Sequence, residues 1–120
     1  PWERDVAAGK LVGQTLGQGP PLYFLTGLET PSAAFRLLAW LLREEFRCTL
    51  FDVVPRDDAR TIGSEAEHLF AVADAQGDKS FGIYASGFGG WVALAAALSA
   101  PVRVRGAVLQ GAYGDRRWSR

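Results

Sequence analysis

Apolar runs that alternate with helix-type segments are the feature that most constrains the fold of this chain. Pro21–Thr26 is a continuous apolar run between glycine-containing turns, which is typical of a strand covered on both faces. Three similar runs predict further strands at Cys48–Val54, Ser80–Ala85 and Val102–Gln110. Because helical segments separate these runs, the pattern predicts an α/β fold with a mostly parallel sheet and helices on both faces.

The segments between the predicted strands carry helix signals. Thr30-Pro31 resembles an N-cap followed by proline at the first helical position, and this helix is predicted to end near Glu45. Ser64 and Glu67 have capping-box spacing and predict a helix that runs to about Gln76. An alanine-rich helix follows Gly89-Gly90 and stops before Pro101, and Lys10–Gly17 is expected to form part of an antiparallel hairpin.

Length and charge limit the classes of protein to consider. The 120 residues are enough for one domain, which we place at 1–120. Lysine and arginine together number 13, as do aspartate and glutamate, so no basic excess favours nucleic-acid binding. Arg116, Arg117 and Arg120 form a small basic tail, which we interpret as a solvated terminus.

The cellular location is predicted from cysteine content and from the first residues. One cysteine, Cys48, excludes an internal disulfide and fits a reducing compartment, so we expect a cytoplasmic protein with this thiol buried. Charged residues at 3–5 do not resemble a signal peptide, and the longest apolar run, Trp91–Ala100, is about half of what a membrane span needs. The start at Pro1 without any methionine suggests an excerpt from a longer polypeptide.

One stretch carries a specific motif. In Ala85-Ser86-Gly87-Phe88-Gly89-Gly90 a strand end, a sharp turn and a small-residue helix start follow one another, which resembles the nucleophile elbow of α/β-hydrolases. Ala85, Gly89 and Gly90 supply the small residues needed where the helix start presses against the strand. Gly87 stands at the nucleophile position, where glycine preserves a turn of positive φ but lacks the hydroxyl.

The resemblance implies the N-terminal half of an α/β-hydrolase fold, over roughly residues 10 to 113, with weaker similarity to maspardin-like and thioesterase-like members. It also implies two oxyanion-hole donors, the backbone N–H groups of Leu28 and Phe88, although both are equally well explained as turn residues. Ser86 is the alternative nucleophile. In that register Tyr84 and Phe88 would fill the two closely packed flanks, for which both are too large.

Acyl transfer in this family also needs a histidine and a carboxylate, which come after later strands of the sheet. The only histidine, His68, falls within a predicted helix away from the turn, and we expect it at the surface or its boundary. The resulting hypothesis is a non-catalytic hydrolase-like protein or fragment that binds a small acyl or carbonyl ligand or a protein partner. The alternative is an active serine hydrolase, of esterase or thioesterase type, whose acid and histidine lie outside this chain.

The last predicted strand raises the question of partners. Val104–Leu109 would leave a long apolar sheet edge, so we expect self-association or a C-terminal half that covers it. We do not expect the chain to bind nucleic acid, a membrane, a metal ion or a cofactor.

Other chemistries have weaker support. A dinucleotide site is disfavoured because Gly87-Phe88-Gly89 lacks the third glycine, and Leu109-Gln110 stands where an acidic residue is expected. Asp52-Val53-Val54-Pro55 keeps only part of the family's Asp-x-x-Gly-x-Gly loop. Asp57-Asp58 is interpreted as a solvated pair.

Overall fold

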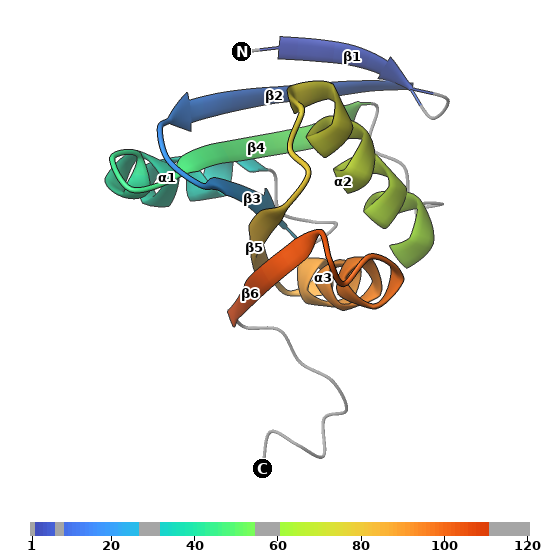
Figure 1. The fold of residues 1–120 in the computed structure, drawn as a ribbon. Helices are drawn as coiled ribbons and strands as arrows, with labels where there is room; N and C mark the ends of the chain where they lie inside the picture. Colours follow the sequence, from blue (N-terminus) through green and yellow to red (C-terminus); the bar gives the residue numbers. More distant parts are fainter. Residues whose placement is uncertain (1, 7–8, 27–31, 55–60, 111–120) are drawn as a thin grey trace.

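The computed structural model describes residues 2–6, 9–26, 32–54 and 61–110. The strands are β1 (Trp2–Val6), β2 (Gly9–Gly17), β3 (Pro21–Leu25), β4 (Arg47–Val54), β5 (Phe81–Ser86) and β6 (Val104–Gln110). The helices are the short 3₁₀ turn η1 (Ser32–Phe35), α1 (Arg36–Leu42), α2 (Ile62–Gln76) and α3 (Phe88–Ser99). Figure 1 shows their arrangement around one twisted sheet.

The six strands form one sheet in the order β1-β2-β4-β3-β5-β6. β2 pairs antiparallel with both β1 and β4, whereas β4, β3, β5 and β6 run parallel to one another. The predicted mostly parallel sheet and the antiparallel hairpin are therefore confirmed. Because β3, β4 and β5 are parallel and neighbouring, the segments that leave their carboxyl ends meet at one edge of the sheet.

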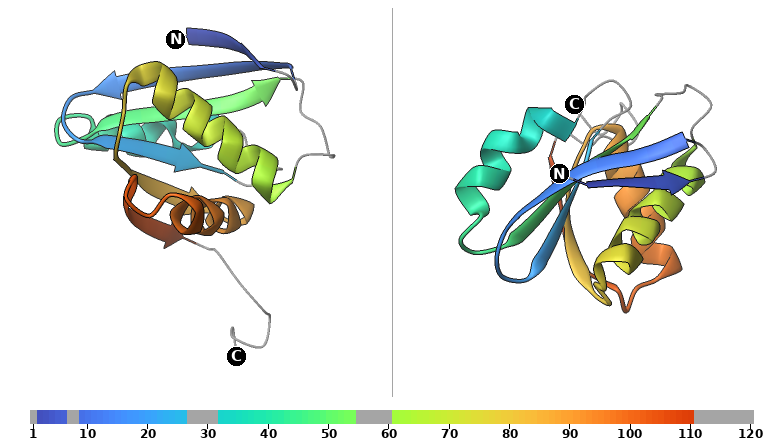
Figure 2. Two further views of the ribbon diagram at one scale, coloured as in Figure 1. Left: turned by 45° about the vertical axis from the view of Figure 1, so that its right-hand side comes forward. Right: turned by 90° about the horizontal axis from the view of Figure 1, so that it is seen from above.

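Helices lie on both faces, with α1 on one face and α2 and α3 on the other (Figure 2). The alternation of side chains along the strands produces two cores. The larger core lies under α2 and α3 and includes the fully buried Leu69, Ile83 and Ala85. The smaller core lies under α1 and includes Phe24 and Cys48.

Several predicted boundaries were wrong. The N-cap of α2 is Thr61, whose side chain accepts a hydrogen bond from the Ser64 N–H. The Thr61 N–H in turn donates to the Ser64 hydroxyl oxygen, so these two residues form the capping box and Glu67 is not part of it. The helix expected to run to Glu45 ends at Leu42, and its predicted start at Thr30-Pro31 lies outside the described residues. Turn residues 101–103 precede β6, so the last strand begins two residues later than predicted.

No helix in the described ranges is long and apolar enough to cross a membrane.

Candidate functional site

The turn between β5 and α3 has the backbone shape that the glycine-rich stretch predicts. Gly87 has φ 57° and ψ −125°, a conformation that side-chain-bearing residues rarely adopt. A Cβ atom built on Gly87 would meet no atom of the described residues within 4 Å. Among the described residues nothing crowds this position, so the restriction that they place on a larger residue here is backbone conformation.

Two residues further on, crowding does decide the sequence. A Cβ on Gly89 would lie 2.4 Å from the backbone oxygen of Leu25, the last residue of β3. The start of α3 is thus pressed against the end of the neighbouring strand, as expected for a sharp strand-turn-helix connection. Ala85 and Gly90 are also buried, so small residues stand at all three predicted positions.

Phe88 is the first residue of α3, and its backbone N–H belongs to the first turn, whose N–H groups lack the usual partner four residues earlier in the helix. One of them, the Gly90 N–H, donates to the Gly87 carbonyl oxygen at 3.0 Å. No side chain caps this turn. The helix dipole places partial positive charge there, so an oxygen acceptor could bind at this end of α3. Leu28, the other predicted donor, lies outside the described residues.

Ser86 has a different geometry from Gly87. It is the last residue of β5, pairs with Gln110 in β6, and is half-buried. Its φ is not positive, because the described residues with positive φ are all glycines. By strand alternation it shares the face of Tyr84, which packs on the α1 side of the sheet, whereas α3 covers the other face.

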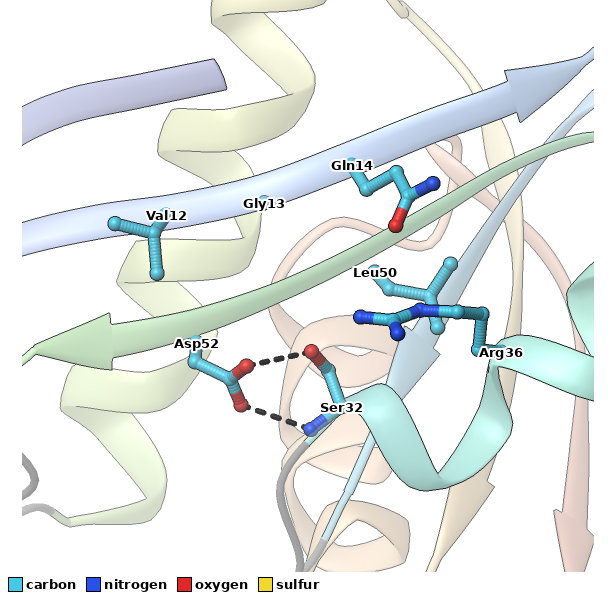
Figure 3. A pocket seen from close by; sticks show the side chains of 7 residues that line it. All are labelled: Val12, Gly13, Gln14, Ser32, Arg36, Leu50 and Asp52. Atoms are coloured by element: carbon cyan, nitrogen blue, oxygen red, sulfur yellow. Dashed lines mark hydrogen bonds between the residues drawn. The ribbon is translucent and has the colours of Figure 1, made fainter. Parts of the chain in front are cut away.

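The structure also reveals a cavity that the sequence did not predict, close to the carboxyl end of β4 (Figure 3). It measures about 310 Å³ and is lined by Val12, Gly13, Gln14, Ser32, Arg36, Leu50 and Asp52. The Asp52 carboxylate accepts two hydrogen bonds from Ser32, at 2.9 Å from its backbone N–H and 2.5 Å from its hydroxyl. Asp52 thereby fixes the residue at which the chain enters η1.

A buried polar network lies toward the amino ends of the parallel strands, away from the Gly87 turn. Gln76 donates to the Tyr23 hydroxyl at 2.8 Å and to the Thr49 hydroxyl at 3.0 Å, and accepts from the Thr15 hydroxyl at 2.6 Å. Tyr23 donates to Asp78, which also pairs with Arg47. Burial, followed by the neighbouring Asp78 carboxylate, raises the pKa of Tyr23 well above its usual range, so this network holds a neutral phenol in the core.

Two of the remaining predicted candidates, His68 and Cys48, are buried. His68 is more buried than predicted, with 9 % of its surface exposed, and its Nδ1 lies 3.9 Å from a Glu65 carboxylate oxygen. Cys48 is fully buried as predicted, and burial raises the pKa of its thiol, which disfavours the reactive thiolate. Asp57 and Asp58 lie outside the described residues. The residues that the structure describes contain no cluster of His, Cys, Asp or Glu suited to a metal ion.

Comparison with solved structures finds the same architecture in hydrolases. A proline iminopeptidase-related protein from Thermus thermophilus is 27% identical with a TM-score of 0.83, over 98% of this chain and 46% of its own. A meta-cleavage product hydrolase from Pseudomonas fluorescens, a mutant complexed with acetates, is 26% identical with a TM-score of 0.79, over 89% of this chain and 43% of its own.

An α/β hydrolase fold protein from Burkholderia ambifaria is 21% identical with a TM-score of 0.83, over 95% of this chain and 44% of its own. This chain thus spans less than half the length of each of these three solved structures. No protein-family model matches the sequence, and a search of curated proteins finds no match either.

Proposed function

Because the chain belongs to the α/β-hydrolase fold superfamily and carries glycine at its strand-turn-helix connection, we propose that it binds a small acyl or carbonyl compound there without cleaving it. In this proposal Gly87 occupies the position of the nucleophile in a nucleophile elbow.

The conformation of Gly87 is the observation that carries this proposal. Covalent acyl transfer needs a hydroxyl or thiol at the tip of the turn, within reach of the bound carbonyl carbon. Gly87 has the strained backbone of such a position but no side chain, and no described residue would crowd a Cβ atom there. Ser86 is a weaker nucleophile candidate, because it continues strand β5 and lies on the face of the sheet opposite α3.

Binding would use the backbone at the start of α3. The Phe88 N–H can donate to a carbonyl or carboxylate oxygen placed over Gly87, and the helix dipole adds a favourable field of about 0.3–1 kcal/mol. Small carboxylates are suitable first ligands, since the Pseudomonas fluorescens hydrolase of the same fold is complexed with acetates. Leu28 would supply the second donor.

A fluorophosphonate probe for serine nucleophiles tests the non-catalytic part of the proposal. We expect the intact mass to stay near 13.0 kDa after treatment, without an adduct. A stoichiometric adduct that disappears in Ser86→Ala would instead support the alternative, an active serine hydrolase whose acid and histidine lie outside this chain.

Acetate titration followed by backbone amide resonances tests the binding part, with chloride at equal ionic strength as control. We expect the amide signals of Gly87 and Gly89 to shift in the wild type. Phe88→Pro removes the N–H, and proline is tolerated at the first position of a helix. Phe88→Ala removes the same side chain but keeps the donor. The proposal requires binding in Phe88→Ala and its loss in Phe88→Pro; equal responses in both variants would contradict it.

A further inference from the structure

The cavity on the α1 face of the sheet is lined by two polar side chains that no described residue binds. It measures about 310 Å³ and lies between β2, β4 and the start of α1 (Figure 3). Among the described residues, neither the Arg36 guanidinium nor the side-chain amide of Gln14 forms a hydrogen bond or an ion pair. Polar groups that converge on a cavity without a partner in the protein are available to fix the orientation of a ligand.

The same cavity holds one charge of each sign. Arg36 reaches it from α1 and Asp52 from the carboxyl end of β4, yet the two side chains do not form an ion pair with each other (Figure 3). Each oxygen of the Asp52 carboxylate accepts one hydrogen bond from Ser32, and each can accept another. Arg36 carries five N–H donors, none of which a described residue uses. The cavity therefore offers a site for an anionic group and a site for a cationic group.

Size and position limit what the cavity can take. Its volume is at the lower end of the range typical of small-molecule sites, and Val12 and the buried Leu50 add apolar surface to its lining. These features suit a compound with a short apolar side chain. The cavity is also separate from the Gly87 turn, because β3 lies between β4 and β5, and it is two strands further from β6 than from β3.

We propose that this cavity binds a small zwitterion of the amino-acid type, with its carboxylate on Arg36 and its ammonium group on Asp52. A guanidinium binds a carboxylate through two parallel N–H···O bonds, and a carboxylate accepts charge-assisted bonds from an ammonium group. The Gln14 amide can donate to the ligand's carboxylate or accept from its ammonium group. The apolar side chain of the ligand packs against Leu50. The proposal is independent of any ligand at Gly87.

Three compounds that differ by one charged group test the proposal. L-leucine carries both charges, isocaproate is leucine without the amino group, and isopentylamine is leucine without the carboxylate. Each is titrated into the whole chain at constant ionic strength, and the backbone amide resonances of Val12, Gln14 and Ser32 report binding. We expect L-leucine to bind at least about tenfold more tightly than either analogue, because each analogue lacks one charge-assisted contact.

Three results of these titrations would overturn the proposal. One is equal binding of L-leucine and isocaproate, and another is the absence of a saturable shift with L-leucine at millimolar concentration. The third is a set of shifts confined to Gly87 and Gly89, which would locate the carboxylate at the start of α3 and leave the proposal for that turn intact.

A matched pair of variants tests the role of Arg36. Arg36→Gln removes the charge at the cavity, whereas Arg105→Gln removes that of another exposed arginine, on β6, which also has no partner among the described residues. Because both arginines are exposed, both variants should keep the wild-type far-UV circular dichroism. Arg36→Gln should weaken L-leucine binding at least about tenfold and leave isopentylamine binding unchanged, and Arg105→Gln should change neither. Equal affinity of both variants for L-leucine would contradict the proposal.

Asp52→Asn tests the other charge through selectivity. L-leucine and isocaproate differ in the ammonium group, so this variant should bind the two equally. Loss of the contact with Ser32 alone would not remove the preference for L-leucine. A variant that folds and still prefers L-leucine would refute the role of Asp52, and if it does not fold, the Arg36 pair and the three ligands decide the proposal.

Discussion

Gly89→Ala should destabilise the protein although alanine is the better helix former. The added Cβ would lie 2.4 Å from the oxygen and 2.7 Å from the carbonyl carbon of Leu25, and both are backbone atoms that cannot rotate away. The start of α3 must therefore move from β3 by more than half an ångström. Overpacking of this kind costs about 1–3 kcal/mol, and the gain in helix propensity returns at most about 1 kcal/mol. We expect a net loss of roughly 1–2 kcal/mol.

Gly63 provides the matched control. It is the second residue of α2, as Gly89 is of α3, but among the described residues a Cβ there would meet only the Thr61 hydroxyl oxygen, at 3.8 Å. Gly63→Ala should therefore raise the free energy of unfolding by up to about 1 kcal/mol. Equilibrium urea unfolding of both variants measures the difference. If Gly89→Ala were as stable as the wild type, the close contact with Leu25 would not exist in solution.

Four further outcomes follow from the described contacts. Gly87→Ala should cost about 1–3 kcal/mol of unfolding free energy from backbone strain alone, and a neutral result in urea unfolding would argue against the positive φ. Gln76→Ala should lower the unfolding free energy by about 1–3 kcal/mol, because it leaves the buried hydroxyls of Tyr23 and Thr49 without this partner; a loss below 0.5 kcal/mol in the same assay would mean that the network contributes little. Thr61→Ala should lower the melting temperature through loss of about 1 kcal/mol of N-cap stabilisation, whereas Glu67→Ala should not. A larger decrease in Glu67→Ala than in Thr61→Ala would instead support the predicted capping box of Ser64 and Glu67. Because burial raises the pKa of the Cys48 thiol, this thiol contributes fully to stability below the pKa of the unfolded chain, about 8.5, and its contribution declines as the pH rises above that value. Between pH 7 and pH 9.5 the free energy of unfolding should therefore fall less in Cys48→Ala than in the wild type.

Local patterns predicted the elements around the turn well. Apolar runs marked β3, β4 and β5, and the spacing of small residues predicted the positive φ of Gly87. These signals are local, because they depend on burial along a strand and on the steric needs of one turn. The α2 cap was misplaced for an equally local reason. Thr61 and Ser64 are both good N-caps, and the hydrogen bonds that distinguish them are visible only in the folded chain.

The sequence could not predict the groups that the topology brings together. Ser32 and Asp52 meet because β3 and β4 are neighbours with parallel directions. Gln76 reaches Thr15 because β2 lies beside β4, although these residues are 61 positions apart. Strand order follows from packing of the whole sheet, and no run of residues encodes it. Isolated polar residues within apolar strands, such as Thr49, were the only available signal.

The glycines of the turn meet two different requirements, and the difference bears on what the turn does. Gly89 is required by packing, because any side chain would collide with Leu25. At Gly87 no atom of the described residues lies within 4 Å of an added Cβ, so against these residues a serine would meet only a conformational cost, which a strained functional site can tolerate. Packing against the described residues therefore does not account for the absence of a hydroxyl at Gly87. This absence supports the proposal of a site that binds without cleaving.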